Sequence, residues 1–416
     1  MTTQSLALGI DFGTSNSAAG MLRDGKPHLI EVEAGERTLP TAFFFDFDTR
    51  KTLIGGAANT ALIDGLEGRY MRALKRVLGT SLMHEKRQIL NERVTFVDII
   101  ARFLKQLKTR AEAETGLVFE RVLSGRPVHF HLNDAARDAK AEEDLLACYL
   151  AAGFKDVAFM AEPEAAAIAS GALDQSKSLG LIVDIGGGTS DFSLFQTQRG
   201  SVNILANHGI RIGGTDFDRA VSIDRVMPLL GKGSELRNLH GPGTMTTPNA
   251  IFNDLATWEK IPFLYTATSR RTVADMHKMS QEPEKLKRFV DVLESELGHD
   301  IAFAVERGKI AANSGTETRA EIDLSIVERG LSAELYPIML DHLLRSFSDS
   351  IQTGALETLA MADCAPARVD RVIYVGGSSL MSFVTNTMKG TFPEAQHEFS
   401  EVFTAVADGL AIAAGH

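Results

Sequence analysis

Cysteine is almost absent from this chain of 416 residues, which has only Cys148 and Cys364, far apart in the sequence. Neither cysteine has a C-x-x-C or metal-ligand spacing, so we expect neither a disulfide framework nor a zinc site. Long apolar runs are missing as well, and the first residues lack a basic region followed by an apolar stretch. We therefore expect no membrane span, no signal peptide and no membrane partner, and a cytoplasmic location.

Positive charge is also scarce in this chain. Lys and Arg total 43 against 54 Asp and Glu, which gives a formal net charge of −11. Nucleic acid is therefore not expected as a partner, because phosphate contacts need clustered positive charge. Hydrophobic residues make up 44% of the chain and charged residues 23%, as in ordinary globular proteins. The length predicts two or three folded domains.

Two common glycine motifs of nucleotide-binding proteins, G-x-x-x-x-G-K-[ST] and G-x-G-x-x-G, do not occur. The sequence instead contains two copies of another motif. In each copy an apolar strand ends in Asp, a glycine turn with Thr and Ser follows, and a second strand begins. The first copy runs from Asp11 to Asn16 and the second from Asp184 to Asp191. This repetition predicts an internally duplicated architecture.

Apolar periodicity and capping residues predict strands that alternate with helices in the rest of the chain. The expected strands are 157–160, 320–324 and 372–375; the expected helices are 99–107, 134–152, one beginning at Glu162-Pro163, one beginning at Gly213 and a last one ending near Ala414. Gly231–Asn249 has no clear period, and we expect a mobile loop there. His129 and His131 alternate around Phe130, which predicts that both lie on one face of a strand. The alternation of strands and helices is typical of an α/β fold.

The Asp-x-Gly-Thr turns suit the binding of a polyphosphate with its metal ion. Glycine lets the backbone approach a phosphate, and successive N–H groups form an anion-binding concavity. An Asp at the end of a strand can hold Mg²⁺ directly or through its waters. A third glycine turn, Gly376-Gly377-Ser378, follows another apolar strand. One such turn alone is usually an ordinary tight turn, but two matched copies and a third turn favour a nucleotide site.

Several segments, in the same order along the chain, resemble the actin-like ATPase superfamily, and within it the ATPase domain of DnaK-type 70-kDa heat-shock chaperones. These segments are residues 9–17, 53–58, 75–79, 162–169, 213–218, 305–309 and 375–379. The resemblance covers about residues 6 to 414. The sequence stops at His416 without an apolar linker or a β-sandwich peptide-binding domain, so it resembles the truncated, YegD-like branch of the family.

The resemblance implies an actin-like α/β fold with two lobes, each a duplicated mixed sheet flanked by helices and carrying an inserted subdomain. Lobe I would comprise residues 1–175 with an insert at about 41–115, and lobe II residues 176–397 with an insert at about 224–328. The final helix, 398–416, would pack back on lobe I.

The same resemblance assigns the residues of an ATPase site. Asp11 and Asp184 would hold Mg²⁺ through waters. Lys75 would reach the γ-phosphate and the attacking water, which Glu162, Asp191 and Thr189 would orient. Positioning and charge neutralisation of this kind suit phosphoryl transfer, which passes through a loose transition state. The implied nucleotide-binding residues are Gly13, Thr14, Ser15, Asn16, Gly186, Gly187, Gly188, Gly213, Gly214, Glu306, Lys309, Ile310, Asn313, Gly376, Gly377, Ser378 and Leu380.

The sequence departs from the family where the base would bind. Ile310 and Leu380 stand where the chaperones have arginines that stack on adenine, and Asn313 replaces a serine. Both cation–π partners are therefore lost, which leaves the base preference open. The region from Leu229 to Asp300 is also unlike the family's usual sequence.

The expected function is that of a slow chaperone-type ATPase, which couples its nucleotide state to the opening and closing of its lobes. The expected cofactors are ATP/ADP and Mg²⁺, and K⁺ is a further candidate. Unfolded protein or a co-chaperone would be its other partners. Two alternatives stay open: a sugar-type small-molecule kinase of the same superfamily, and a nucleotide-gated scaffold or filament protein that does not hydrolyse.

Overall fold

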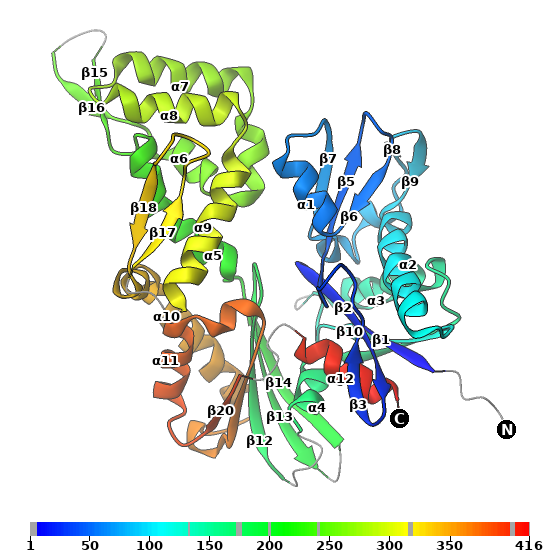
Figure 1. Ribbon diagram of the computed structural model, residues 1–416. Helices are drawn as coiled ribbons and strands as arrows, with labels where there is room; N and C mark the ends of the chain where they lie inside the picture. The colour runs from blue at the N-terminus through cyan, green and yellow to red at the C-terminus, as the bar shows by residue number, and fades with distance from the viewer. Residues whose placement is uncertain are drawn as a thin grey trace. The chain divides into compact units, whose positions relative to one another are not determined.

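The computed structural model describes residues 6–131, 134–171, 177–198, 201–238, 242–314, 319–399 and 404–415 (Figure 1). Contacts divide the chain into two compact units. Unit 1 comprises Met1–Ile210, Gln352–Leu380 and Met388–His416, and unit 2 comprises Arg211–Ile351 and Met381–Thr387. The lobe and insert boundaries expected from the resemblance stay predictions, and residues 400–403 and 416 of the expected final helix lie outside the described residues.

The first large sheet of unit 1 is built mainly from the beginning of the chain. Its strands are β1 (Ala7–Phe12), β2 (Asn16–Arg23), β3 (Lys26–Leu29), β4 (Leu39–Pro40), β10 (Arg121–Arg126) and β11 (Asp156–Ala161). They run in the order β3-β2-β1-β10-β11, with β4 paired to β2. Strand β1 is antiparallel to β2 and parallel to β10, so the first Asp–glycine turn connects an antiparallel hairpin.

The second large sheet of unit 1 repeats this plan. Its strands are β12 (Leu179–Ile185), β13 (Ser190–Gln198), β14 (Ser201–Ile210), β19 (Arg371–Val375) and β20 (Gln396–Glu398). They run in the order β14-β13-β12-β19-β20, and β12 is antiparallel to β13 and parallel to β19. Because strand order and directions match those of the first sheet, the predicted duplication and mixed α/β architecture are confirmed.

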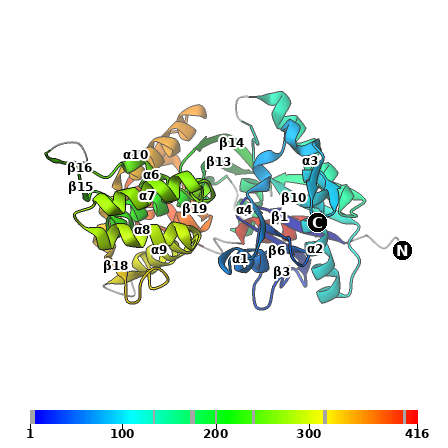
Figure 2. The same cartoon turned by 90° about the horizontal axis from the view of Figure 1, so that it is seen from above.

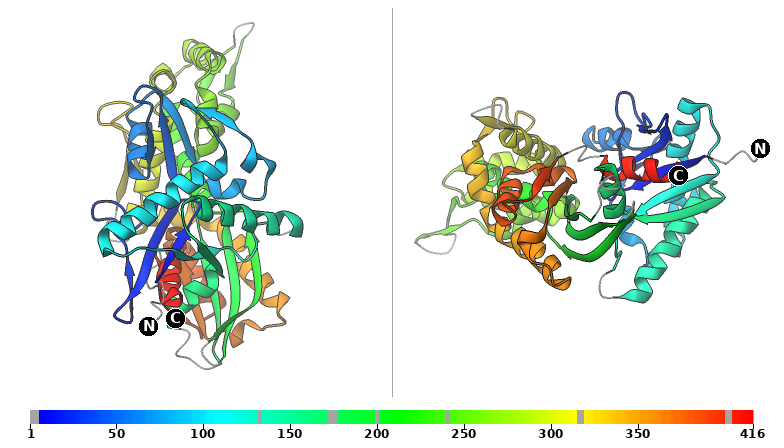
Figure 3. Two further views of the ribbon diagram at one scale, coloured as in Figure 1. Left: turned by 90° about the vertical axis from the view of Figure 1, so that its right-hand side faces the viewer. Right: turned by 90° about the horizontal axis from the view of Figure 1, so that it is seen from below.

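Two helices rich in small residues join these sheets within unit 1. Helix α12 (Ala405–Ala414) contacts β1, β2, β3 and β10 and also α4 (Glu162–Ala169). Figure 3 shows this last helix against the first strands of the chain. A β-carbon on Gly409 would lie 1.8 Å from the carbonyl oxygen of Ala165, and one on Gly9 would lie 2.7 Å from the amide nitrogen of Ala411. Glycine is therefore needed at both positions, because only it permits this backbone approach.

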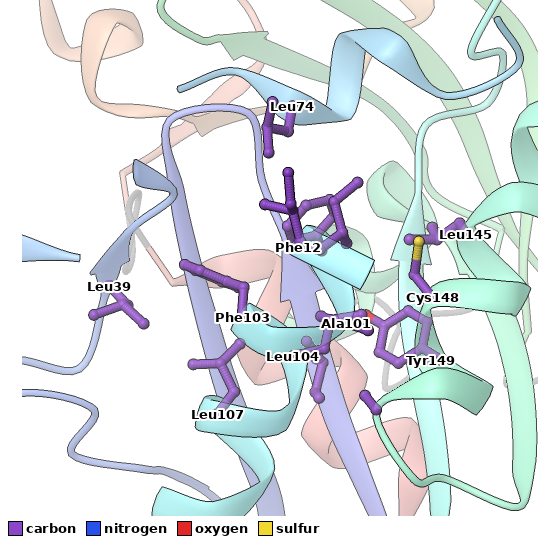
Figure 4. Close-up of a cluster of buried hydrophobic side chains, with 14 of the residues drawn as sticks. Phe12, Leu39, Leu74, Ala101, Phe103, Leu104, Leu107, Leu145, Cys148 and Tyr149 are labelled. Atoms are coloured by element: carbon purple, nitrogen blue, oxygen red, sulfur yellow. The ribbon is translucent and has the colours of Figure 1, made fainter. Parts of the chain in front are cut away.

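The large hydrophobic core of unit 1 lies between the first sheet and the helices α2 (Phe96–Thr115) and α3 (Ala135–Ala151). The two helices contact each other, and Figure 2 shows both on the same side of the picture as β1 and β10. Figure 4 shows part of this core, in which Phe12 of β1 meets Phe103 of α2 edge-on with ring centroids 5.8 Å apart. Tyr149 of α3 is fully buried in the same cluster. Helix α2 begins with a capping box between Thr95 and Asp98, which satisfies its first amide groups.

A smaller sheet and short elements complete the first part of unit 1. The sheet has the order β6-β5-β7. The elements are β5 (Ala42–Asp46), β6 (Thr52–Ile54), α1 (Gly56–Ile63), β7 (Gly68–Arg72), the 3₁₀ helices Leu74–Val77 and Ser81–His84, β8 (Arg87–Ile89) and β9 (Glu92–Val94).

Unit 2 is mainly helical. Its elements are α5 (Gly214–Val221), β15 (Glu235–Arg237), β16 (Thr244–Thr246), α6 (Asn249–Leu255), the 3₁₀ helix Trp258–Leu264, α7 (Ala267–Met279), α8 (Pro283–Glu294), α9 (Gly298–Asn313), β17 (Ala320–Asp323) and β18 (Ser332–Leu335). Helices α10 (Pro337–Met361) and α11 (Ser382–Thr391) belong partly to each unit. Helix α9 packs on β17, and a β-carbon on Gly308 would lie 2.6 Å from the side chain of Ile322.

Two local expectations were wrong. The segment predicted as a loop, Gly231–Asn249, contains the hairpin β15–β16, whose strands are too short to show a period; residues 239–241 lie outside the described residues. The two histidines do not lie on a strand, because β10 ends at Arg126, just before Pro127, which cannot donate to a sheet. His131 Nε2 lies 2.9 Å from the carbonyl oxygen of Leu78. The part of the chain that the structure describes contains no helix long and apolar enough to cross a membrane.

Replacing Gly409 by alanine tests the close packing of α12. We expect Gly409→Ala to lower the free energy of unfolding by about 1 to 3 kcal/mol, because the new methyl group would clash with the backbone of Ala165. The matched control is Gly390→Ala in α11, where a β-carbon meets nothing within 4 Å and helix propensity predicts a gain of up to about 1 kcal/mol. Urea unfolding of both variants is the measurement. Equal stability of the two variants would contradict the packing argument.

Candidate active site

The two Asp–glycine turns lie at equivalent positions of the two sheets. Asp11 lies near the end of β1 and pairs in register with Ala18 of β2; Asp184 lies near the end of β12 and pairs with Asp191 of β13. The two hairpins therefore differ at the position opposite the aspartate, where the second hairpin has a carboxylate and the first has a methyl group. Like charges directly opposite each other on neighbouring strands destabilise a sheet, so the Asp184–Asp191 pair indicates a functional role.

A lysine and a glutamate from distant segments meet beside these aspartates. The Nζ of Lys75 lies 2.5 Å from Oε1 of Glu162, and the two side chains are only 10% and 17% exposed. Glu162 is the first residue of α4 and follows β11 directly. Lys75 lies in the 3₁₀ helix Leu74–Val77, which follows Ala73 with φ of 58°. Such a left-handed conformation is strained for alanine, and strain of this kind persists where the surrounding structure holds it.

Helix α3 holds the Lys75 segment in place. Gly79 has φ of 75°, and its amide donates to Oδ2 of Asp144 over 2.9 Å. Asp144 is buried, and its Oδ1 lies 2.8 Å from Nε2 of His84 and 3.1 Å from Nζ of Lys140. Sequence reasoning missed Asp144, because an acidic residue in a tract rich in Ala, Glu and Lys looks like an ordinary exposed side chain.

The carboxylates have unusual pKa values. Burial, and next the charge of Glu162, raises the pKa of Asp11 to about 7. Burial and the neighbouring Asp191 raise the pKa of Asp184 to about 8. Burial and Glu162 raise the pKa of Asp191 to about 6, although a hydrogen bond with Thr189 opposes this shift. The residues named from the resemblance as catalytic and metal-binding are therefore neighbours in unit 1.

Lys75 is held in its charged form by these neighbours. Burial alone would lower its pKa, but Glu162 and Asp11 outweigh burial and raise it. Asp11, Glu162, Asp184 and Asp191 together still carry more negative charge, when ionised, than one lysine can balance. Carboxylate oxygens are the ligands that a hard divalent cation prefers, so the residues present fit Mg²⁺.

The protein groups form no metal cage by themselves. Among the described residues, no group of three or more His, Cys, Asp or Glu side chains is placed to hold a metal ion. Magnesium typically keeps several waters and uses one or two carboxylates together with substrate phosphates. Asp11 and Asp184 suit that mode of binding.

The glycine turns approach the carboxylates closely. A β-carbon on Gly13 would lie 2.0 Å from the carbonyl oxygen of Asn16, and one on Gly187 would lie 3.0 Å from Oγ of Ser15, so the first two turns come together. Gly376 has φ of 77°, and its β-carbon would lie 2.8 Å from Oδ1 of Asp184. Three glycine turns thus meet beside one aspartate. The other residues expected from these turns are Thr14, Gly186, Gly188, Gly377, Ser378 and Leu380, the last three of which lie in the 3₁₀ helix Gly377–Leu380.

A cavity of about 40 Å³ adjoins the carboxylates. Glu162, Asp184 and Asp191 are among its lining residues, together with the polar side chains of Ser193 and Asn207. This volume exceeds the 10–15 Å³ or so that one water molecule needs, and the polar lining supplies hydrogen-bond partners.

The remaining expected site residues lie in unit 2. Gly213 and Gly214 begin α5, and the amide of Gly213 donates to Oδ2 of Asp216 over 3.0 Å. On α9, Glu306 and Ile310 are exposed, whereas Lys309 is buried with its Nζ 2.7 Å from Asp218. Oδ1 of Asn313 accepts a hydrogen bond from the amide of Ser382 over 2.8 Å. Their roles stay predictions.

The raised pKa values of the aspartates should make the stability of the protein depend on pH. Below about pH 4 the three aspartates are protonated in both the folded and the unfolded protein. Above that pH the unfolded protein loses these protons first, because the pKa values are raised in the folded protein alone. The free energy of unfolding therefore falls progressively up to about pH 8. Without divalent cations, we expect Asp184→Asn to melt at a higher temperature than the wild type at pH 8, with a smaller difference at pH 5. Asp24→Asn, in an exposed turn with φ of 52° that suits asparagine, should match the wild type. Thermal melts in EDTA decide this, and a wild type that is the more stable protein at pH 8 would contradict it.

The sequence was also compared with known proteins. The chain is 26% identical to the chaperone protein DnaK of Ureaplasma urealyticum serovar 10 over 417 residues, covering 99% of this chain and 59% of the relative. It is 27% identical to the chaperone protein DnaK of Thermosipho melanesiensis over 414 residues, covering 98% of this chain and 58% of the relative. The chain thus spans about three fifths of the length of these curated relatives.

The family described as Hsp70 protein matches residues 7–227, which is more than half of the chain. This range contains the two Asp–glycine hairpins, Lys75 and Glu162. The duplicated sheets are those of the actin-like ATPase fold that the resemblance implied. The chain belongs to the Hsp70 protein family.

Proposed function

We propose that the chain binds Mg–ATP and hydrolyses it to ADP and phosphate, as the ATPase part of an Hsp70-type chaperone. The observation that carries this proposal is the cluster of Lys75 with Asp11, Glu162, Asp184 and Asp191, at the place where three glycine turns meet. Family membership supports it, since the curated relatives are named chaperone proteins.

The charges of the cluster suit phosphoryl transfer to water. Asp11 and Asp184 would hold Mg²⁺ through its waters, and the ion would neutralise phosphate oxygens. The amides of Gly186, Gly187 and Gly188 would donate to phosphate oxygens, as turns rich in glycine do. Lys75, whose pKa is raised, stays protonated and offsets the charge that develops on the transferred group.

The cavity beside Glu162 and Asp191 is large enough for the attacking water, which supports this part of the proposal. Both carboxylates can accept its hydrogen bonds, and Thr189 is hydrogen-bonded to Asp191, which fixes the direction of that side chain. Because Asp191 has a pKa of about 6, it is ionised at neutral pH and close to the value that suits a proton acceptor. Oriented in this way, the water loses a proton to a carboxylate as it attacks.

The coupling of hydrolysis to other proteins belongs to the same proposal. Nucleotide state would open and close the lobes, and unfolded protein or a co-chaperone would respond to this motion. A slow rate, a cytoplasmic location and a K⁺ ion beside the Mg²⁺ are further parts of the proposal. The described residues offer no separate support for a kinase or a filament protein.

Calorimetric titration with Mg–ATP, combined with a turnover assay, tests the proposal. We expect the wild type to bind Mg–ATP, and Lys75→Ala to lower turnover by about 100-fold or more while weakening ATP binding much less. Lys105→Ala, an exposed lysine of α2, is the control and should leave both unchanged. Failure of the wild type to bind any nucleotide would overturn the proposal.

The same titration with Mg–GTP addresses base preference. Ile310 is 57% exposed on α9 and offers only apolar contact where the family stacks an arginine. We expect the wild type to bind ATP only slightly more tightly than GTP. Ile310→Arg should increase ATP affinity by about threefold to tenfold, because a cation–π contact contributes about 0.5–2 kcal/mol. An unchanged ATP affinity in this variant would contradict a base contact at residue 310.

A further inference from the structure

Two consecutive cations in the 3₁₀ helix Leu74–Val77 have different surroundings. Lys75 is paired with Glu162, as described above. The next residue, Arg76, is exposed, and its guanidinium group lies against the glycine turn of the second copy, at Gly188. A β-carbon on Gly188 would lie 2.1 Å from Nη2 of Arg76 and 3.4 Å from its Cζ. The guanidinium therefore occupies the space that a side chain at residue 188 would fill.

Glycine at position 188 has a spatial reason. Its φ lies outside the left-handed region, so the backbone there is one that alanine can also adopt. The nearest atoms that a β-carbon would meet both belong to Arg76. A side chain at residue 188 would therefore require the guanidinium of Arg76 to move away from this turn.

The guanidinium of Arg76 is available to a ligand. Within the described residues it makes no hydrogen bond and no ion pair, although the chain has more acidic than basic residues. Some other arginines of unit 1 are paired: Arg371, for example, donates to Glu398 through Nε over 2.8 Å and through Nη2 over 2.5 Å. The open guanidinium lies beside the loop that also approaches Ser15 of the first turn.

We propose that Arg76 binds the terminal phosphate of the nucleoside triphosphate and thereby makes the site prefer triphosphate over diphosphate. This inference rests on the proposed function. A guanidinium is always charged and matches phosphate oxygens with two parallel N–H donors. The positive charge of Lys75 is already balanced in part by Glu162. The positive charge of Arg76 would therefore balance the negative charge of the terminal phosphate that Lys75 leaves uncompensated.

The test compares Mg–ATP and Mg–ADP affinities of the full chain by calorimetry. We expect Arg76→Gln to weaken Mg–ATP binding by about tenfold or more, as the loss of a charged hydrogen bond does, and Mg–ADP binding by less than about twofold. Arg76→Lys should recover part of the loss, since it keeps the charge without the paired donors. Arg69→Gln, an exposed arginine of β7, is the control and should leave both affinities unchanged.

A second variant tests the contact with the loop. Gly188→Ala places a methyl group where the guanidinium lies, so we expect it to weaken Mg–ATP binding in the same direction. In a double-mutant cycle, Gly188→Ala should add little to Arg76→Gln, because the arginine that it displaces is already gone. Thermal melts of each variant show that it is folded.

The outcomes separate the two proposals. If the wild type binds neither nucleotide, the proposed function fails and the role of Arg76 fails with it. If the wild type binds Mg–ATP but Arg76→Gln weakens ATP and ADP equally, or neither, the role of Arg76 is overturned while the ATPase proposal stands. Fully additive effects of Arg76→Gln and Gly188→Ala would also overturn it.

Discussion

The excess of buried negative charge around Lys75 is the constraint on which the site depends. Asp184 and Asp191 face each other across β12 and β13, and Asp11 and Glu162 lie within their electrostatic reach, with one lysine as the balancing charge. Burial raises the pKa values of the aspartates because this arrangement is costly when no further cation is bound. Under the proposed function, a divalent cation and a phosphate chain would offset this cost.

The scaffold brings these charges together by duplicating one sheet and packing helices tightly upon it. Each copy places an aspartate near the end of its first strand, and glycine turns allow the loops to meet. Gly409 lets the final helix touch the backbone of α4, whose first residue is Glu162. The position of Glu162, the carboxylate proposed to orient the attacking water, therefore depends on packing between the beginning and the end of the chain.

The Lys75 segment shows how local strain and distant support combine. Ala73 adopts a left-handed conformation before Lys75, and Gly79 adopts one after it. Asp144 of α3 and His131 hold the segment through its backbone at Gly79 and Leu78. Arg76 of the same short helix lies against Gly188, so one segment places both cations beside the Asp–glycine turns.

The hairpins with Asp11 and Asp184, the duplication and the mixed α/β class can be predicted from the amino-acid sequence, because short-range glycine and apolar patterns encode them. The pairing of Asp191 with Asp184, the support of the lysine segment by Asp144 and the contact of Arg76 with Gly188 become visible in the folded chain alone. The contacts of Asp144 and Arg76 join residues far apart in the chain, and the register that pairs Asp191 with Asp184 across their hairpin is not recorded in a local pattern. The hairpin β15–β16 was misjudged because its strands have too few residues to show a period. The two histidines were misjudged because Pro127 ends β10 before it reaches them.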